Sequence, residues 1–292
     1  MKPAAFEYHD PRQLSEALAL LQMHPEVAKV LAGGQSLVPL MNFRLARPGV
    51  VVDINRVQEL RHISEAPSGI AIGALARHAD IDRSPLIADL MPVLREAARL
   101  VGHPQIRNRG TVGGSVAHAD PAAELPCALL ALEARYHLAS VAGSRVVSGD
   151  DLFVDVFTTA IRPHELLVEI EVPTLPPRTG HAFVEFARRH GDFALGGACA
   201  LLTLDGDGRC ARARLALLAA GPRPLRARAA EAVLEGTHLD AAALERAAGA
   251  AVANVSPSGD IHGSSWYRVR LLETLARRSL DLAAGRAREL WQ

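Results

Sequence analysis

The chain has 292 residues, 49% of them hydrophobic, with 32 basic and 32 acidic side chains. This length suits two domains with buried cores, and the balanced charge gives no electrostatic attraction for nucleic acid or an anionic membrane surface. The start of the chain has no hydrophobic core of signal-peptide length, and hydrophobic runs such as residues 128–132 are too short to cross a bilayer, so we expect a cytoplasmic protein with no integral membrane segment.

The three cysteines lie far apart and include no CxxC pair. An odd number of widely spaced cysteines argues against a disulfide framework, and against a zinc or iron–sulfur site within this chain. We therefore expect no metal site here and interpret Cys127, Cys199 and Cys210 as buried thiols in a reducing compartment.

The first third of the chain predicts short strands and one clear helix. Asp10 and Pro11 are typical of a helix start, and His24-Pro25 of its end; between them, apolar residues at positions 14, 17, 18 and 21 share one face. Hydrophobic, β-branched residues at 27–31 and 50–54 predict strands. A Pro-Ser-Gly turn before residues 70–72 predicts a hairpin with residues 62–64.

The middle of the chain mixes helical and extended patterns. Residues 85–101 have the spacing of one amphipathic helix, and residues 111–117 are predicted as a glycine-rich strand. Pro121 opens a helix that runs through Leu132, and two strands around residues 142–144 and a third at 166–172 follow.

Beyond a proline-rich linker at residues 173–177 the pattern changes. Two long strands, 194–204 and 210–219, are joined by Asp205-Gly206-Asp207-Gly208, a strong hairpin signal. Three helices are predicted near residues 225–234, 240–252 and 264–282. The expected fold class is therefore α+β with mixed or antiparallel sheets, because the regular strand–helix alternation of a doubly wound fold is absent.

The segment Ala32-Gly33-Gly34-Gln35-Ser36-Leu37 follows a predicted strand and leads into a helix-like stretch. A glycine pair allows backbone amides to approach an anion closely, and a following helix start adds partial positive charge. Ser36 can donate a further hydrogen bond. On these residues alone, the evidence for a phosphate-binding loop is weak, because a glycine pair after a strand is more often a plain tight turn.

A second glycine-rich segment covers residues 110–117 and leads to Asp120 and Glu124. Ionised carboxylates only accept hydrogen bonds, so these two suit ribose hydroxyls and not phosphate. Two such segments, far apart in sequence, predict a clamp around both phosphates of a dinucleotide. The fingerprints GxGxxG and GxxxxGK[ST] are both absent, so the predicted site is not of the Rossmann or P-loop type.

Together these motifs resemble a known family. Residues 32–37 with Pro39 and Arg44, and residues 111–114 with residues 119–126, resemble the FAD-binding medium subunits of aerobic carbon monoxide dehydrogenase and related molybdenum hydroxylases; the FAD domain of xanthine dehydrogenase is a more distant relative. The resemblance covers essentially the whole chain.

The resemblance implies a two-part FAD-binding domain of the vanillyl-alcohol-oxidase (PCMH) type over residues 1–175, with subdomains at about 1–57 and 58–175. A smaller α+β carboxy-terminal domain, with a hairpin-rich sheet and helices, would cover residues 176–292. Asp192 and Phe193 match the place where family members set a residue against the isoalloxazine. Some relatives have tyrosine there, so this chain lacks that phenol hydroxyl.

The resemblance also implies roles for individual residues. The flavin itself would carry the redox chemistry, so no catalytic side chain is expected. The candidate cofactor-binding residues are Ala32, Gly33, Gly34, Gln35, Ser36, Leu37, Gly102, Thr111, Gly113, Gly114, Ser115, Ala117, Asp120, Glu124, Asp192 and Phe193.

The expected function is electron transfer through noncovalently bound FAD, from iron–sulfur clusters to an external acceptor. The [2Fe-2S] clusters would reside on a small partner subunit and the molybdenum cofactor on a large one, in a heterotrimer or a dimer of heterotrimers. Two alternatives stay open: a self-sufficient flavin-dependent reductase or oxidase of the same fold, with Ser115 or His118 as proton donor, and a flavin-free scaffold subunit. The loop glycines argue against the scaffold.

Overall fold

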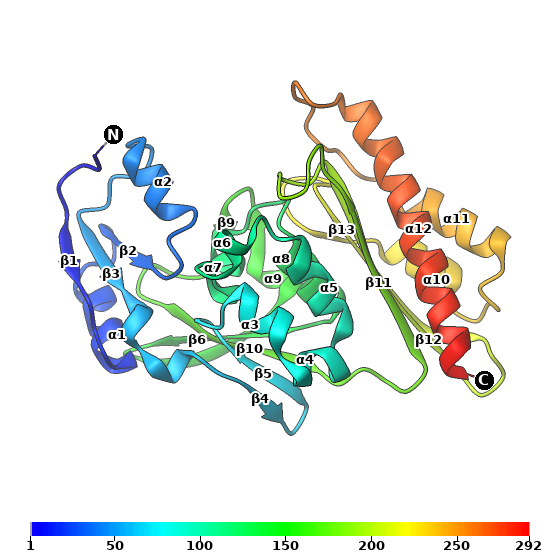
Figure 1. The fold of residues 1–292 in the computed structure, drawn as a ribbon, viewed down its shortest axis with the longest axis horizontal. Coiled ribbons are helices and arrows are strands. Elements are labelled where there is room, and N and C mark those ends of the chain that lie inside the picture. Colours follow the sequence, from blue (N-terminus) through cyan, green and yellow to red (C-terminus); the bar gives the residue numbers. More distant parts are fainter. Residues whose placement is uncertain (1, 292) are drawn as a thin grey trace.

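The structure is a computed structural model that describes residues 2–291. Its first sheet has three short parallel strands in the order β1-β3-β2, at the amino-terminal end of the molecule (Figure 1). Residues Val50–Asp53 are hydrophobic and β-branched, which suits the central position between two neighbours. The elements of this part are β1 (Glu7–His9), α1 (Leu14–Met23), β2 (Ala28–Leu31), α2 (Leu37–Asn42), β3 (Val50–Asp53) and the short turns η1 (Ile54–Arg56) and η2 (Gln58–Leu60).

Helix α1 begins later than the sequence predicted. The Glu16 carboxylate accepts hydrogen bonds from the amides of Arg12 and Gln13, at 2.9 and 3.3 Å, and so satisfies the free amides at the helix start. Asp10 was predicted to cap the helix, but it forms an ion pair with Arg56 instead.

An antiparallel five-stranded sheet, in the order β4-β5-β10-β6-β7, forms the middle of the molecule. The hairpin predicted near residues 62–72 is confirmed, with Ile63 opposite Ile72. The elements are β4 (Ile63–Ala66), β5 (Gly69–Gly73), β6 (Arg135–Ser140), β7 (Gly143–Ser148), β10 (Leu166–Pro173) and, beside the sheet, α9 (Gly149–Leu152), β8 (Phe153–Asp155) and β9 (Thr158–Thr159).

Six helices lie between β5 and β6 in the chain, and three of them differ from the sequence predictions. The single helix predicted over residues 85–101 is broken at Met91, because Pro92 disfavours a helical conformation in the residue before it. The predicted strand 111–117 is a helix. The six are α3 (His78–Arg83), α4 (Pro85–Leu90), α5 (Pro92–Leu100), α6 (Pro104–Arg107), α7 (Val112–His118) and α8 (Glu124–Ala131).

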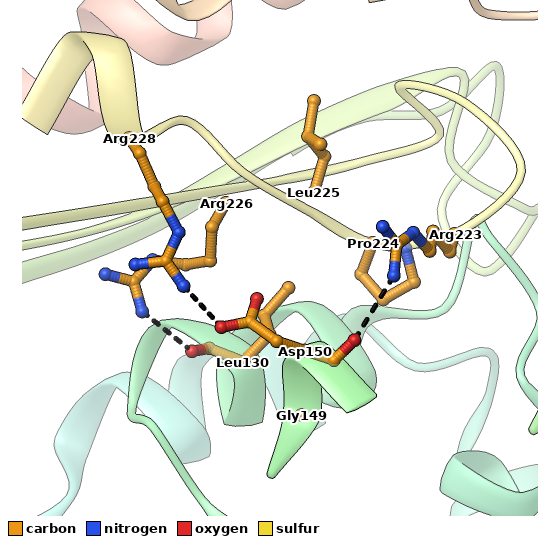
Figure 2. Close-up of a pocket in the computed structure, with 8 residues that line it drawn as sticks. All are labelled: Leu130, Gly149, Asp150, Arg223, Pro224, Leu225, Arg226 and Arg228. Carbon is orange, nitrogen blue, oxygen red and sulfur yellow. Dashed lines mark hydrogen bonds and ion pairs between the residues drawn. The ribbon is translucent and has the colours of Figure 1, made fainter. Parts of the chain in front are cut away.

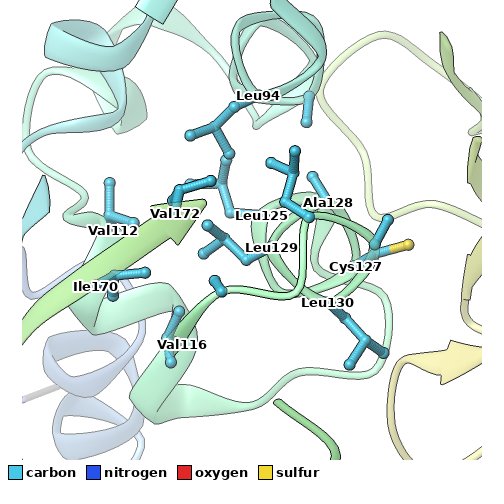
Figure 3. Close-up of a cluster of buried hydrophobic side chains, with 14 of the residues drawn as sticks. Leu94, Val112, Val116, Leu125, Cys127, Ala128, Leu129, Leu130, Ile170 and Val172 are labelled. Carbon is cyan, nitrogen blue, oxygen red and sulfur yellow. The ribbon is translucent and has the colours of Figure 1, made fainter. Parts of the chain in front are cut away.

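Helix α8 is buried on all sides, in keeping with its hydrophobic sequence. Its Leu125 and Leu129 lie toward Ile170 and Val172 of β10, whereas Cys127 points away from them (Figure 3). The Cys127 thiol contacts the backbone at Cys199 of the next sheet. Helix α8 therefore lies between two sheets and joins both into one hydrophobic core.

The third sheet has four antiparallel strands in sequence order. The hairpin predicted at residues 205–208 is confirmed. The predicted helix 225–234 begins with a short strand instead, and the last helix is longer than expected. The elements are β11 (Thr179–Phe186), β12 (Gly196–Leu204), β13 (Cys210–Leu218), β14 (Leu225–Arg226), α10 (Arg228–Leu234), α11 (Ala241–Ala251) and α12 (Ser265–Trp291).

Helix α12 crosses the face of this sheet that is turned away from α8 (Figure 1). The approach is unusually close at Gly180 of β11, where a side-chain carbon would meet the backbone of Ala283 and Ala287. Small and leucine side chains from both elements, among them Leu202 and Leu280, form the second hydrophobic core. Glycine and alanine at these positions allow the helix to lie directly on the strands.

Arginine side chains cross between the middle sheet's loops and the third sheet (Figure 2). Arg223 donates to the carbonyl of Phe153 at 2.9 Å, Arg228 donates to the carboxylate of Asp150, and Arg226 is paired with Glu231 at 2.7 Å. They line a cavity of about 150 Å³. Because each guanidinium already has a protein partner, we interpret this cavity as part of the contact between the middle and third sheets and not as a ligand-binding site.

The observed fold is thus α+β, as predicted, although its first sheet is purely parallel. All three cysteines are free and buried. Within residues 2–291, the helices include none that is both long and apolar enough to cross a bilayer, and no group of three or more potential side-chain ligands could hold a metal ion.

Candidate functional site

The first glycine loop, residues 32–37, follows β2 at the carboxyl edge of the parallel sheet. Within the described part of the chain, the backbone amides of residues 33–37 donate no hydrogen bond to the protein. The carbonyls of Gly34 and Ser36 accept from the first turns of α2, at 3.1 Å each. Five adjacent free amides at a helix start are well suited to bind an anion.

The second glycine segment, residues 110–117, is mostly helix α7 and not the predicted strand. Thr111 caps this helix by accepting a hydrogen bond from the Gly114 amide at 3.0 Å. Glycine disfavours a helical conformation, but glycine is needed at position 113 because the helix packs closely on Ala74. A side-chain carbon at Gly113 would lie 2.6 Å from the Ala74 methyl.

Most backbone amides of the second segment already have partners; the exception in the described residues is Thr111, whose amide donates no hydrogen bond. Val112 and Gly113 donate to the carbonyls of Ala76 and Ala74, at 2.9 and 3.0 Å, and Ser115 donates to Thr111 at 3.0 Å. These amides are therefore not available to a phosphate. Apart from the Thr111 amide, this segment would have to bind a ligand through its side chains, and the run of adjacent free amides is in the first loop.

The structure brings the two glycine segments together, as a clamp requires. A side-chain carbon at Gly33 would lie 2.5 Å from the carbonyl oxygen of Arg109 and 2.7 Å from Cα of Gly110. Only glycine fits this approach without movement of the backbone. The first loop thus contacts the residues immediately before Thr111.

The two predicted carboxylates differ in environment. Asp120 is half-exposed and accepts from the Ala122 amide at 2.9 Å, so it suits the role of an ionised acceptor. Glu124 is 9% exposed, and burial raises its pKa to about 7. Burial, with Glu124 nearby, raises the pKa of Glu185 on β11 to about 8. At neutral pH Glu124 is therefore partly protonated, a state that the sequence did not predict.

The remaining candidates lie on two loops that contact each other. Gly102 adopts a left-handed conformation between α5 and α6, with φ of 48°. The next residue, His103, lies directly against Gly191 of the β11–β12 loop. Asp192 and Phe193 follow on that loop, and Phe193 is 78% exposed. Its ring is therefore free to contact a ligand.

A cavity of about 360 Å³ lies beside the first glycine loop. Its other walls are formed by Asp53 and Asn55, at the carboxyl end of β3, and by Arg109. Asp53 and Asn55 were not among the cofactor-binding residues predicted from the sequence. Their position directly after the β-branched strand 50–52 was a usable signal, since ligands bind at the carboxyl ends of parallel strands. The lining residues are Leu31, Ala32, Gly33, Gly34, Gln35, Val38, Pro39, Asp53, Asn55 and Arg109.

Comparison with known proteins agrees with this geometry. Residues 4–175 match the family described as FAD binding domain in molybdopterin dehydrogenase, and residues 181–283 match the CO dehydrogenase flavoprotein C-terminal domain. Among curated proteins, the chain is 48% identical to the 6-hydroxypseudooxynicotine dehydrogenase complex subunit alpha of Paenarthrobacter nicotinovorans, over 99% of this chain and 97% of that protein. It is 38% identical to the carbon monoxide dehydrogenase medium chain of Hydrogenophaga pseudoflava, over 98% and 99%.

Solved structures give the same result. A chain of the carbon monoxide dehydrogenase from Hydrogenophaga pseudoflava superposes with a TM-score of 0.95 at 40% identity, covering 98% of this chain and 99% of that one. A chain of quinoline 2-oxidoreductase from Pseudomonas putida 86 superposes with a TM-score of 0.93 at 39% identity, again covering 98% and 99%.

Proposed function

The chain belongs to the family of FAD-binding medium subunits of molybdenum hydroxylases, which are oxidoreductases, and we propose that it is the electron-transfer subunit of such a complex. FAD supplies the redox chemistry, because it exchanges electrons singly with iron–sulfur clusters and in pairs with an external acceptor. The part of this chain is to bind, orient and shield that cofactor.

The observation that carries the proposal is the set of five free amides in residues 33–37, in a loop whose Gly33 lies against the Arg109–Gly110 backbone. Free amides in a half-buried loop match a diphosphate, whose oxygens accept hydrogen bonds. We assign the diphosphate to this loop, an ionised ribose-hydroxyl acceptor to Asp120, and a contact with the isoalloxazine to Phe193. We propose that the FAD is held noncovalently by these contacts.

The proposed partners are a small iron–sulfur subunit and a large molybdenum subunit, in a heterotrimer or a dimer of heterotrimers. The support comes from relatives that are themselves named as subunits or medium chains, over nearly the full length of this chain. On this proposal the organic substrate is selected by another chain. The three buried free cysteines are consistent with the proposed cytoplasmic location.

The first experiment is the visible absorption spectrum of the purified chain, followed by heat denaturation and identification of the released nucleotide. We expect a yellow protein that releases free FAD in a 1:1 ratio, in keeping with a single diphosphate loop. A chain that remains colourless with excess FAD, both alone and with co-expressed partners, would contradict the proposal in favour of a scaffold role.

A second measurement tests the electron-transfer role. The chain is expressed with its neighbouring genes, and the proteins that co-purify are analysed for iron and molybdenum. We expect both metals in the complex and neither in the isolated chain. A yellow chain that purifies alone and oxidises or reduces an organic substrate by itself would favour the self-sufficient reductase or oxidase.

A further inference from the structure

Asn55 connects the two strand ends that form the wall of the cavity. It follows β3, and its Nδ2 donates to the carbonyl of Ala32, the first residue of the glycine loop, at 2.6 Å. The same amide nitrogen and the Asn55 backbone N–H both donate to Asp53 Oδ1, at 2.6 and 2.9 Å. Tyr8 holds the other carboxylate oxygen of Asp53 at 2.7 Å. The side chain of Asn55 is therefore held in one orientation.

Arg77 continues this network toward the second glycine segment. Its Nη2 donates to Asn55 Oδ1 at 2.7 Å, and its Nη1 donates to the carbonyl of Arg109. Its backbone pairs with Thr111 in an isolated bridge. Burial, with the neighbouring Arg61 and Arg109, lowers the pKa of Arg77, and the two hydrogen bonds hold its guanidinium in place.

Both ends of the network meet at the contact between the glycine segments. The Arg109 carbonyl that accepts from Arg77 is also the atom that lies against Gly33. The Ala32 carbonyl that accepts from Asn55 belongs to the residue before Gly33. The two side chains therefore hold both backbones at the point where the loop must stay open for a ligand.

We propose that Asn55 and Arg77 are positioning residues for the FAD diphosphate. They set the separation between the first glycine loop and the Arg109 carbonyl, and so preorganise the free amides of residues 33–37. This inference rests on the proposed function. A ligand bound by preorganised donors loses less free energy to ordering the loop, which raises affinity.

Arg77 acts in this arrangement through its planar fork and not through its charge. One arm of the guanidinium is occupied by Asn55 and the other by Arg109. A lysine would keep the positive charge, but one ammonium group on a flexible stem does not reproduce two donors held in a plane. The proposal therefore predicts that Arg77→Lys fails to restore FAD affinity, whereas a direct charge–phosphate contact would be largely restored.

The test uses apoprotein of the full chain with its partners, prepared as Asn55→Ala, Arg77→Lys and Arg77→Met. The matched controls are Asn108→Ala and Arg61→Met, which remove an exposed amide beside Arg109 and a positive charge beside Arg77. The dissociation constants of FAD and of ADP, which shares the diphosphate, are measured by fluorescence titration and competition. The unfolding midpoint of each apoprotein is measured in parallel.

We expect all three variants to bind FAD and ADP about 10- to 100-fold more weakly, as loss of hydrogen bonds to a charged group implies, while both controls stay within about twofold of the wild type. Lower unfolding midpoints with unchanged dissociation constants would overturn the proposal in favour of a purely structural role. Full rescue by lysine would overturn it in favour of a charge contact. If the wild-type complex itself binds no FAD, the proposed function fails first.

Discussion

At the scale of single residues, Gly33 is the most constrained position of the site. A side-chain carbon there would lie 2.5 Å from a backbone oxygen, which a rotamer change cannot relieve. We predict that Gly33→Ala abolishes FAD retention and destabilises the apoprotein by about 1–3 kcal/mol, as overpacking does. Bound FAD per chain and urea denaturation measure the two effects.

The control for this prediction is Gly206→Ala, since Gly206 lies in an exposed hairpin turn with no atom within 4 Å of the added carbon. This variant should keep full FAD content. Stoichiometric FAD in Gly33→Ala would show that the loop has been assigned wrongly.

Phe193, unlike Gly33, contributes little to the packing of the fold. Its side chain is 78% exposed, so Phe193→Ala should change the free energy of unfolding by less than about 0.5 kcal/mol. If its ring contacts the isoalloxazine, the visible absorption bands of bound FAD should shift in this variant. Ile261→Ala, at a position 94% exposed, serves as the control. Identical spectra in all three proteins would remove Phe193 from the site.

Sequence patterns located the first glycine loop because glycines beside a hydroxyl residue, after a strand, have a direct physical meaning. They could not reveal Asn55 or Arg77, because the roles of these residues depend on which strands become neighbours. Nor could they show that Glu124 is buried, since its neighbour Glu185 lies on a different sheet. The ligand-binding roles of all the candidate residues stay predictions.

At the scale of elements, α7 shows how packing overrides local preference. Its glycine-rich sequence disfavours a helix, but the Thr111 side chain and the backbone carbonyls of Ala74 and Ala76 accept hydrogen bonds from its first amides. These carbonyls come next to the helix only in the tertiary structure, which local sequence patterns do not show. The predicted strand was therefore wrong. By contrast, the β12–β13 hairpin was predicted correctly because its turn sequence determines it locally.

The cap itself is testable. Thr111→Val keeps the shape of the buried side chain but removes the oxygen that accepts from Gly114, and should lower the free energy of unfolding by about 1 kcal/mol. Chemical denaturation of the apoprotein measures this change. Thr111→Ser retains the oxygen and should lose clearly less than the valine variant. Equal losses would mean that the methyl group matters and the cap does not.

At the scale of the whole molecule, two carboxyl groups meet where the middle sheet's helix α8 lies on the third sheet. The two groups are Glu124 and Glu185. Glu185 Oε2 is buried and has no hydrogen-bond partner in the described residues, and the charged group that acts on it is the acidic Glu124. The charged group that acts on Glu124 is the acidic Asp120. The pKa values of Glu124 and Glu185 are raised from 4.5 to about 7 and about 8. Burial favours the protonated form of both groups, and repulsion from Asp120 adds to the pKa of Glu124 and repulsion from Glu124 to that of Glu185.

This predicts a pH dependence of defined sign. Because the folded state binds these protons more tightly than the unfolded state, their stabilising effect is complete below pH 4.5 and is lost as the pH rises to about 8. In Glu185→Gln the free energy of unfolding should fall less steeply over this range than in the wild type. Glu65→Gln, at an exposed position, is the control. Parallel pH profiles of all three proteins would show that the pair is not coupled to folding.

The overall α+β architecture agrees with the expected flavoprotein fold, whereas the division into domains at residue 175 stays a prediction. The helix α8 and the hydrophobic core around it join the middle and third sheets, which no local pattern could show. Helix α8 is buried on every side, and this feature requires cover from more than one layer.

The close contact of α12 with Gly180 also has a consequence for biosynthesis. The ribosome completes β11 and β12 long before it adds the 27 residues of α12, which take roughly 1 to 5 s at ordinary elongation rates. During that interval one face of the sheet is bare, with its alanines, leucines and unshielded glycine backbone open to other nascent chains. The helix that completes this sheet is thus the segment whose late synthesis leaves this hydrophobic face uncovered.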